Sequence, residues 1–325
     1  MILDLKGKLD LNVVSDDKDI NKLITIYTSP ETNITLIDDI LLNMLMESSR
    51  GDNRHGSCGM GIWEASLRTE AGYGINMDYL YNATVEDLVN RLKTIRNEYV
   101  YPRIATLGLD ISIDPDIDEL LSKDDALYNF AERVIDNMKY VKLQDMTRDF
   151  LSKYSDIIFE TGQGLCLDAE NQRSLPHVTG SRTGITNPVK LLDEIGLQLD
   201  MAVYVTRSYL TKHGAGPLQN EDPNLREQIN SNDLTNVHNP WQGTIRYARF
   251  ENTDWILDNI RDDLNNNGFQ GKTVLFVTHL NETNGRIFCK GFEENIESFI
   301  DRQSVFDKVY VSYTRFAEDV EERGN

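Results

Sequence analysis

Three glycine-rich stretches hold the residues of this chain that are best suited to bind a charged ligand. They are "RHGSCGMGI" at 54–62, "ETGQG" at 160–164 and "TKHGAGP" at 211–217. Glycine lets backbone N–H groups approach an anion closely, as they do in loops that bind phosphate. Taken singly, each stretch is more typical of an ordinary turn. A binding function therefore depends on which of them the fold brings together.

Gln163 is the most specific candidate among these residues. Its side-chain amide offers one donor and one acceptor to the edge of a base. Gly162 and Gly164 flank it and leave room for a ligand. The preceding "SDIIFE", residues 155–160, is apolar and β-branched, which predicts a buried strand running into this turn.

Other common chemistries are disfavoured. "GFQGKTVLF" at 268–276 has a Gly-Lys pair, but Asn266 stands where a phosphate loop needs its first glycine, and a strand follows the lysine. We therefore predict a helix-to-strand turn there and find no recognisable triphosphate loop. His55 and Cys58 share one loop without an evident orienting acid, which argues against a thiol nucleophile. The three cysteines show no metal-ligand spacing and, being odd in number, no disulfide framework.

Composition limits the class of partner. The formal net charge of −20 over 325 residues disfavours a nucleic-acid backbone as the main partner, although single nucleotides can still bind in local pockets. The sequence has no apolar run of about 18 residues, so we expect no membrane span. The mixed, acidic N-terminus does not resemble a signal peptide. We expect a cytoplasmic protein with reduced thiols.

Strand patterns alternate with helical patterns through the second half of the chain. Apolar strands are predicted in "MAVYVTRSYL", "KTVLFVTHL" and "FDKVYVSYTRF", and a shorter strand-like piece in "KLITIYTSP" at 22–30. Helices are predicted in "TLIDDILLNMLMESSRG", "TVEDLVNRLKTIRNEYV", "NPVKLLDEIGL", "TDWILDNIRDDLNNNG", "FEENIESFIDRQ" and across 116–155. This alternation predicts an α/β fold with a mostly parallel central sheet flanked by helices. We expect one domain, 1–325, with a helical insertion at about 75–155.

Six segments, taken in order from about residue 25 to 320, resemble the adenylosuccinate synthetase family. They are "YTSPETNITLIDDILLNMLMESSRG", "HGSCGMGI", "FETGQGLCLD", "LPHVTGSRTG", "YLTKHGAGPL" and "GTIRYARFE". "FETGQGLCLD", for example, is similar to the family's Phe-Glu-Gly-Ala-Gln-Gly-x-x-Leu-Asp. The family joins IMP to aspartate at the expense of GTP, with magnesium, through a 6-phosphorylated IMP. Its fold is related to phosphate-loop NTPases.

The resemblance implies a set of binding residues. Gln163 matches the glutamine that contacts IMP, and Thr179 the threonine that holds its phosphate. Ser57 and Cys58 stand at the family's Thr-Thr pair, where a thiol donates poorly. Arg68 is placed as the arginine that crosses to the neighbouring subunit of a homodimer, although its spacing differs.

The aspartate and base-binding segments are altered. Arg246 matches one arginine of the aspartate loop, where a guanidinium suits a carboxylate. Thr244 occupies the other arginine position, with the loss of a charge. "VTHLN" and "VSYTRF" stand at the base-binding end and supply His279, Asn281 and Ser312. Because Asn281 replaces the family's guanine-reading aspartate, ATP or a deoxynucleotide is as compatible as GTP.

The family's phosphate loop, Gly-Asp-Glu-Gly-Lys-Gly-Lys, and its catalytic histidine have no counterpart in this sequence. That loop carries the catalytic base, the histidine is the acid, and both help to place the triphosphate and Mg²⁺. We therefore expect no catalytic residue and no metal ligand in this chain, with Gln163 in a supporting role. The resemblance implies a fold without the N-terminal phosphate-loop unit.

Three functions remain open from the sequence. The first is the larger part of a split ligase that takes a purine monophosphate and GTP or ATP and needs a phosphate-loop subunit in trans. The second is a catalytically inactive sensor that binds a purine nucleotide, favoured by Cys58, Thr244 and Asn281. The third is a scaffold protein without a ligand, with which the acidic composition is compatible.

Overall fold

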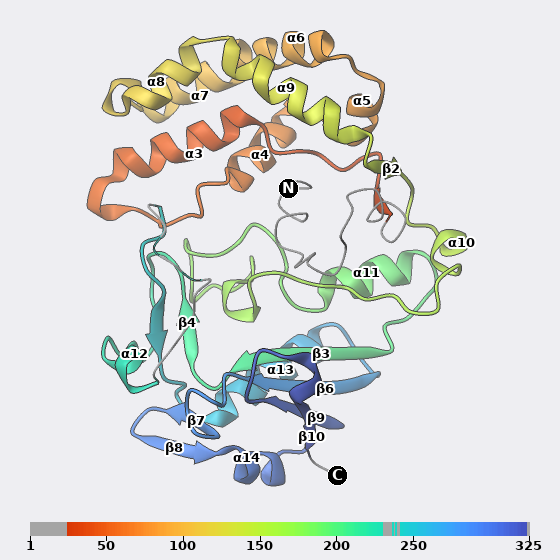
Figure 1. Cartoon of the computed structure of the whole chain (residues 1–325), viewed down its shortest axis with the longest axis vertical. Coiled ribbons are helices and arrows are strands. Elements are labelled where there is room, and N and C mark those ends of the chain that lie inside the picture. Colours follow the sequence, from red (N-terminus) through yellow and green to blue (C-terminus); the bar gives the residue numbers. More distant parts are fainter. Residues whose placement is uncertain (1–24, 230–235, 237, 239–240, 324–325) are drawn as a thin grey trace. The chain divides into compact units, whose positions relative to one another are not determined.

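The chain divides between Lys153 and Tyr154 into two compact units, Met1–Lys153 and Tyr154–Asn325. The structure is a computed structural model, and residues 25–229, 236, 238 and 241–323 are described (Figure 1). The predicted helical insertion, about 75–155, lies almost wholly in the first unit, and the long predicted strands lie in the second. That the two units form one domain, as the sequence analysis expects, stays a prediction.

The first unit is helical. Its two short strands, β1 (Ile26–Thr28) and β2 (Val141–Leu143), pair in parallel. Its helices are α3 (Ile37–Arg50), α4 (Ile62–Arg68), α5 (Met77–Asn82), α6 (Val85–Ile95), α7 (Tyr101–Leu107), α8 (Pro115–Ser122), α9 (Asp125–Met138) and α10 (Arg148–Leu151). Two π-helical segments, Thr69–Tyr73 and Arg96–Val100, follow α4 and α6.

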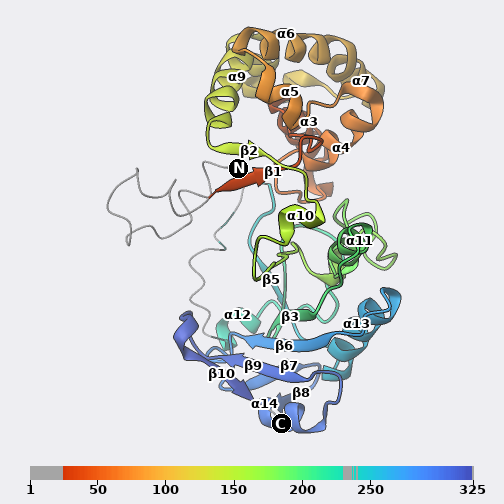
Figure 2. The same ribbon diagram turned by 90° about the vertical axis from the view of Figure 1, so that its right-hand side faces the viewer.

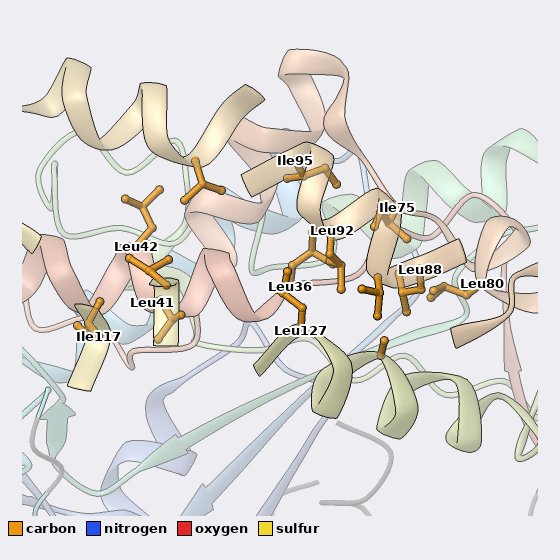
Figure 3. Close-up of a cluster of buried hydrophobic side chains, with 14 of the residues drawn as sticks. Leu36, Leu41, Leu42, Ile75, Leu80, Leu88, Leu92, Ile95, Ile117 and Leu127 are labelled. Atoms are coloured by element: carbon orange, nitrogen blue, oxygen red, sulfur yellow. The ribbon is translucent and has the colours of Figure 1, made fainter. Parts of the chain in front are cut away.

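Helix boundaries in this unit follow local sequence signals. Thr84 caps α6 by accepting a hydrogen bond from the Asp87 amide, and the Asp87 carboxylate accepts one from the Thr84 amide. Gly51, at φ 53°, ends α3 as the sequence predicts. The apolar faces of α3, α6 and α9 meet in one core, seen in Figure 3 around Leu36, Leu92 and Leu127.

Two buried ion pairs lie beneath the start of α3. Arg68 is fully buried, and its Nε lies 2.9 Å from Asp39 Oδ1. Arg96 Nη2 lies 2.6 Å from Oδ1 of the adjacent Asp38. Burial raises the pKa of Asp39, and the Arg68 guanidinium opposes that rise. Charges this deep are tolerated only when they are paired and hydrogen-bonded.

The second unit is built on a sheet in the order β10-β9-β6-β3, with its strands side by side in Figure 2. β3 (Met201–Arg207), β6 (Lys272–Thr278) and β9 (Lys308–Ser312) are parallel, and β10 (Val320–Arg323) is antiparallel to β9. Two antiparallel pairs are separate from this sheet: β4 (Leu210–Lys212) with β5 (Arg246–Ala248), and β7 (Arg286–Cys289) with β8 (Phe292–Asn295). The helices are α11 (Thr186–Glu194), α12 (Leu225–Gln228), α13 (Thr253–Asn266) and α14 (Ile296–Arg302).

These elements confirm the predicted α/β class and the three long parallel strands. Three local predictions are wrong. Residues 141–143, inside the helical stretch predicted across 116–155, form β2, because they pair with β1. Residues 155–160 form no strand, because no described strand pairs with them. Residues 292–295 form β8 rather than the start of a helix, because they pair with β7. Residues 22–24 of the first predicted strand and the N-terminus lie outside the described residues. No helix in the described part of the chain is long and apolar enough to cross a membrane.

We predict that Asp39→Asn destabilises the first unit by about 3–5 kcal/mol, because it leaves the Arg68 charge buried without its partner. The control is Glu119→Gln, which removes one side of an exposed pair with Lys123 and should change stability little. Urea unfolding followed by circular dichroism measures both variants. Equal effects would contradict the importance assigned to the buried pair.

Candidate functional site

The loop that carries Thr179 is closed by the carboxylate of Asp168. This carboxylate accepts hydrogen bonds from the amides of Glu170 at 2.9 Å and Thr183 at 2.8 Å, and from Arg182 Nε at 2.9 Å. Burial alone would raise the pKa of Asp168, but the two amides and the Arg182 guanidinium hold it below its usual range. The ionised form therefore holds the loop, and this contribution is lost as the pH falls through that lowered pKa.

A second carboxylate, Asp263 on α13, ties the end of the same loop to the sheet. It accepts hydrogen bonds from the Ile185 amide at 3.1 Å and from the Tyr204 hydroxyl on β3 at 2.8 Å. A Cβ added at Gly184 would lie 2.2 Å from its Oδ2, so this position requires glycine. Burial and the Asp263 charge raise the pKa of Tyr204, which keeps its hydroxyl a donor.

The Gly-Gln-Gly turn has a backbone that favours exposure of its amide side chain. Gln163 adopts φ 65° and Gly164 φ 86°, both in the left-handed region. This conformation costs a residue with a side chain about 1–2 kcal/mol, and such costs concentrate at functional sites. A Cβ at Gly162 or Gly164 would meet nothing within 4 Å. The Gln163 side chain is exposed and makes no hydrogen bond to the described residues.

The His-Gly-Ala-Gly loop after β4 lies against the loop that carries Thr179. Gly216, at φ 90°, is so close to the His177 ring that an added Cβ would lie 2.4 Å from Cγ. Thr179 follows two residues after His177, and its amide donates to the Leu167 carbonyl at 2.8 Å. The Thr179 hydroxyl is half-buried and has no hydrogen-bond partner among the described residues. Two predicted motifs are thus in direct contact.

Arg246 brings the third motif into this cluster. From β5, its Nη1 donates to the carbonyls of Gly214 and Gly216, at 2.9 Å each. Its Nε donates to Glu221 Oε1 at 2.7 Å, so the guanidinium is already paired with a carboxylate of the chain itself. Lys212 donates to the Ala215 carbonyl at 2.7 Å, and burial, with the nearby Arg246 charge, lowers its pKa. We name Thr179, His177, Gly216 and Arg246 the loop cluster. Gln163 lies four residues before Leu167, whose carbonyl accepts from Thr179, and makes no hydrogen bond to these residues.

Thr244, which the sequence analysis places beside Arg246 in the aspartate loop, is exposed and lies two residues before it. It offers a hydroxyl but no charge to a substrate. The cluster therefore has one guanidinium where the family pattern has two.

The predicted base-binding residues lie at the carboxyl ends of the parallel strands. His279 follows β6 with φ 60°, and its carbonyl accepts a hydrogen bond from Ser208 Oγ, just after β3, at 3.0 Å. Ser312, the last residue of β9, is buried, and its hydroxyl donates to the Thr314 carbonyl at 2.6 Å. Asn281 is exposed in the turn after β6. Ligands of open α/β sheets bind at this end of the strands.

The first unit holds the other glycine-rich loop. Ser57 Oγ donates to Asn43 Oδ1 at 3.0 Å, and the Gly56 amide donates to the buried Glu47 carboxylate at 2.9 Å, both on α3. Cys58 is exposed and is not in a disulfide. The Ser57 hydroxyl is thus engaged by α3, while the Cys58 thiol faces solvent.

Arg68 lies in the core of the first unit. Its guanidinium nitrogens donate to Asp39 and to the carbonyls of Ile34 and Tyr73, all within the first unit. Its side chain has no exposed surface, and its contact with a neighbouring subunit stays a prediction. Nothing local in the sequence signals this pairing with an acid 29 residues before it.

Four residues that sequence reasoning missed shape the site: Asp168, His177, Glu221 and Asp263. Asp168 and His177 stand inside the quoted motifs, so their position was a usable signal. Glu221 and Asp263 lie in acidic stretches that look like solvated surface. Among the described residues, no group of three or more His, Cys, Asp or Glu side chains is placed to hold a metal ion.

Comparison with known proteins identifies the fold that carries these loops. A family model described as adenylosuccinate synthetase matches residues 13–247, which is more than half of the chain. The chain belongs to the adenylosuccinate synthetase family.

Individual members of the adenylosuccinate synthetase family are distant. The adenylosuccinate synthetase of Limosilactobacillus reuteri is 26% identical over 200 residues, 59% of this chain and 42% of that protein. That of Psychromonas ingrahamii is 22% identical over 263 residues, 79% of this chain and 56% of that protein. The chain thus spans about half the length of these curated relatives.

A solved structure is similar in fold. The structure of fully ligated adenylosuccinate synthetase from Plasmodium falciparum matches with a TM-score of 0.51 and 17% identity. The match covers 80% of this chain and 57% of that one. At this identity the likeness shows that the two chains share the adenylosuccinate synthetase fold.

We predict that Gly216→Ala destabilises the second unit more than Gly291→Ala. Both glycines have positive φ, at 90° and 79°, so both variants incur the left-handed cost of about 1–2 kcal/mol. Only Gly216 meets another group, the His177 ring, which should add about 1–3 kcal/mol of overpacking. Denaturant unfolding measures both, and adding His177→Gly, which removes the ring and the Cβ that lies 2.7 Å from the new methyl group, should relieve only Gly216→Ala. No relief would show that the two loops do not touch in solution.

Proposed function

We propose that this chain is the larger part of a purine nucleotide ligase that joins aspartate to an IMP-like purine monophosphate at the expense of GTP or ATP. A separately encoded polypeptide would supply the phosphate loop. The supporting observation is the loop cluster, in which His177 packs on Gly216 and Arg246 donates to Gly214 and Gly216. This contact gathers three motifs that are separate in the sequence. Family membership supports the reaction class.

Gln163 and Thr179 have proposed roles that their environments allow. The exposed Gln163 amide would pair with the purine edge, and its left-handed backbone presents it without a competing partner in the described chain. The Thr179 hydroxyl, also without such a partner, would donate to the monophosphate. Ser57 and Cys58 lie in the first unit, where Ser57 donates to Asn43, and their contact with a phosphate stays a prediction.

Aspartate would bind at Arg246 by replacing an internal carboxylate. Glu221 now accepts from the guanidinium in the geometry that a substrate carboxylate would need. Glu221 is one-third exposed, so it can turn to solvent when aspartate enters. Thr244 would add a hydroxyl contact. We expect aspartate affinity to be modest, because each binding event breaks this ion pair.

The purine base of the nucleoside triphosphate would lie at the carboxyl ends of the parallel strands, near His279, Asn281 and Ser312. Asn281 is the exposed residue of the three, and its side-chain amide is proposed to hydrogen-bond the edge of the base. The buried Ser312 hydroxyl already donates to Thr314 and would support the loop instead. The described residues do not fit a Mg²⁺ site, so we assign the metal and the γ-phosphate to the phosphate-loop polypeptide. A homodimer stays a prediction.

One observation favours a second candidate, a catalytically inactive nucleotide sensor. The Arg246–Glu221 pair would leave purine binding at Gln163 and Thr179 intact while blocking aspartate. Nucleotide binding without turnover, even with a phosphate-loop protein present, would support this reading over the ligase.

We predict that IMP stabilises the purified chain by about 2.7 kcal/mol at about 100 times its dissociation constant. Gln163→Ala should abolish that stabilisation. The matched control is Gln172→Ala, an exposed glutamine nine positions further along, which should bind IMP as the native chain does. Thermal unfolding with and without IMP measures all three. No shift with any purine nucleotide would contradict both nucleotide-binding proposals.

Native purification of the tagged chain tests the ligase itself. We expect a protein with a Gly-x-x-Gly-x-Gly-Lys-type loop to co-purify, and the pair to consume aspartate, IMP and GTP or ATP. The chain alone should show no turnover. Purification without such a protein would overturn the split-ligase proposal.

A further inference from the structure

β3 forms one edge of the sheet in the second unit and has one side open. Among the described residues it pairs only with β6. The Asp200 carbonyl accepts from Lys272, and the Ser208 amide donates to Thr278, so even-numbered residues direct their backbone groups toward β6. Since successive residues of a strand alternate, Met201, Val203 and Val205 direct their N–H and C=O groups to the open side.

The side chains of the same three residues form an exposed apolar row. Met201 and Val203 are 50% exposed and Val205 is 66% exposed, whereas Ala202 on the other face is 3% exposed. Tyr204, also on that other face, packs against the core that α13 and α14 share with β6 and β9. One face of β3 thus packs in the core, while the other is apolar and uncovered.

The opposite edge of the sheet is protected in a way that β3 is not. β10 presents Glu321, Glu322 and Arg323, and Glu322 pairs with Lys308 on β9. Charges on an edge strand discourage pairing with another chain. β3 carries no charge before Arg207, its last residue. An unprotected, apolar edge of seven residues is the expected form of a strand that has a partner.

A second segment of this unit also lacks a partner. Residues 155–160 have the composition of a buried strand but pair with no strand in the described part of the chain, and Ile158 is 90% exposed. A strand forms only when another strand satisfies its backbone groups. The open edge of β3 and residues 155–160 therefore both lack a partner strand among the described residues.

We propose that the open edge of β3 accepts a parallel strand from the separately encoded phosphate-loop polypeptide, whose next helix covers Met201, Val203 and Val205. This inference rests on the proposed function. A phosphate loop joins a strand to the helix that follows it, so one such unit supplies both the edge partner and the cover. Parallel pairing places the loop at the carboxyl end of β3, beside Ser208 and His279, where the base-binding residues lie.

The share of the solved relative that this chain does not match is large enough for this occupant. The match to the solved relative leaves 43% of that protein without a counterpart here, since it covers 57%. That share is large enough for several strand–helix units. A second copy of this chain would instead pair β3 with β3 about a two-fold axis, which is antiparallel and brings no phosphate loop.

The test compares two apolar-to-acid variants of similar exposure. Val205→Asp places a charge in the proposed interface, and Phe292→Asp places one on β8, where Phe292 is 48% exposed. The phosphate-loop protein that co-purifies with the native chain is prepared pure, and its affinity for each variant is measured by calorimetry. We expect Val205→Asp to weaken binding by about 100-fold or more, because it buries an unpaired charge. Phe292→Asp should bind as the native chain does.

Hydrogen exchange resolved to single amides gives an independent readout of the native complex. The amides of Val203 and Val205 should exchange quickly in the chain alone and slowly in the complex, while those of Ala202 and Tyr204 are slow in both. Residues 156–160 should also gain protection. Circular dichroism should confirm that Val205→Asp is folded.

The outcomes separate this inference from the proposed function. Equal binding by both variants, with the Val203 and Val205 amides unprotected, would overturn the β3 interface while leaving the split ligase intact. No co-purifying phosphate-loop protein would overturn both. Protection of these amides in the chain alone would also overturn the interface. If that protection depended on protein concentration, a second copy of the chain would cover β3. If it did not, residues of the same chain would cover it.

Discussion

The Asp263 carboxylate is the contact on which the arrangement of the candidate site depends. From α13 it accepts the Ile185 amide and the Tyr204 hydroxyl at once, and so joins a helix, a strand and the end of the ligand loop. Gly184 is close enough that any side chain there would displace it. A buried acid can hold three elements only if donors satisfy its oxygens, and here the loop itself supplies one of them.

Other carboxylates in the chain also hold neighbouring groups in place by accepting hydrogen bonds. Asp39 fixes Arg68, Glu47 holds the Gly56 amide, and Asp168 closes the loop around Thr179. The net charge of −20 is therefore not only a surface property. Several buried carboxylates stabilise loops by accepting hydrogen bonds from backbone amides that have no partner in a strand or helix. This leaves glycine-rich loops free to present their exposed side chains to a ligand.

Local signals explain what the sequence predicted well. β3, β6 and β9 are apolar, β-branched runs, which is the sequence pattern typical of strands in a parallel sheet. The glycine motifs were found because positive φ at Gly164 and Gly216 restricts those positions to glycine. Long-range pairings were missed because nothing local encodes them. Arg68 finds Asp39 across 29 residues, and Arg246 finds Glu221 across 25.

The failed strand at 155–160 has a different cause. Its residues have the right composition, and only the partner is lacking, which is also true of the open side of β3. A β-strand forms only when a neighbouring strand pairs with it. A sequence pattern can therefore identify a segment that is able to form a strand, although no strand of the described chain pairs with it. The loop cluster, in contrast, is complete within one unit, which is why its geometry could be assembled from this chain alone.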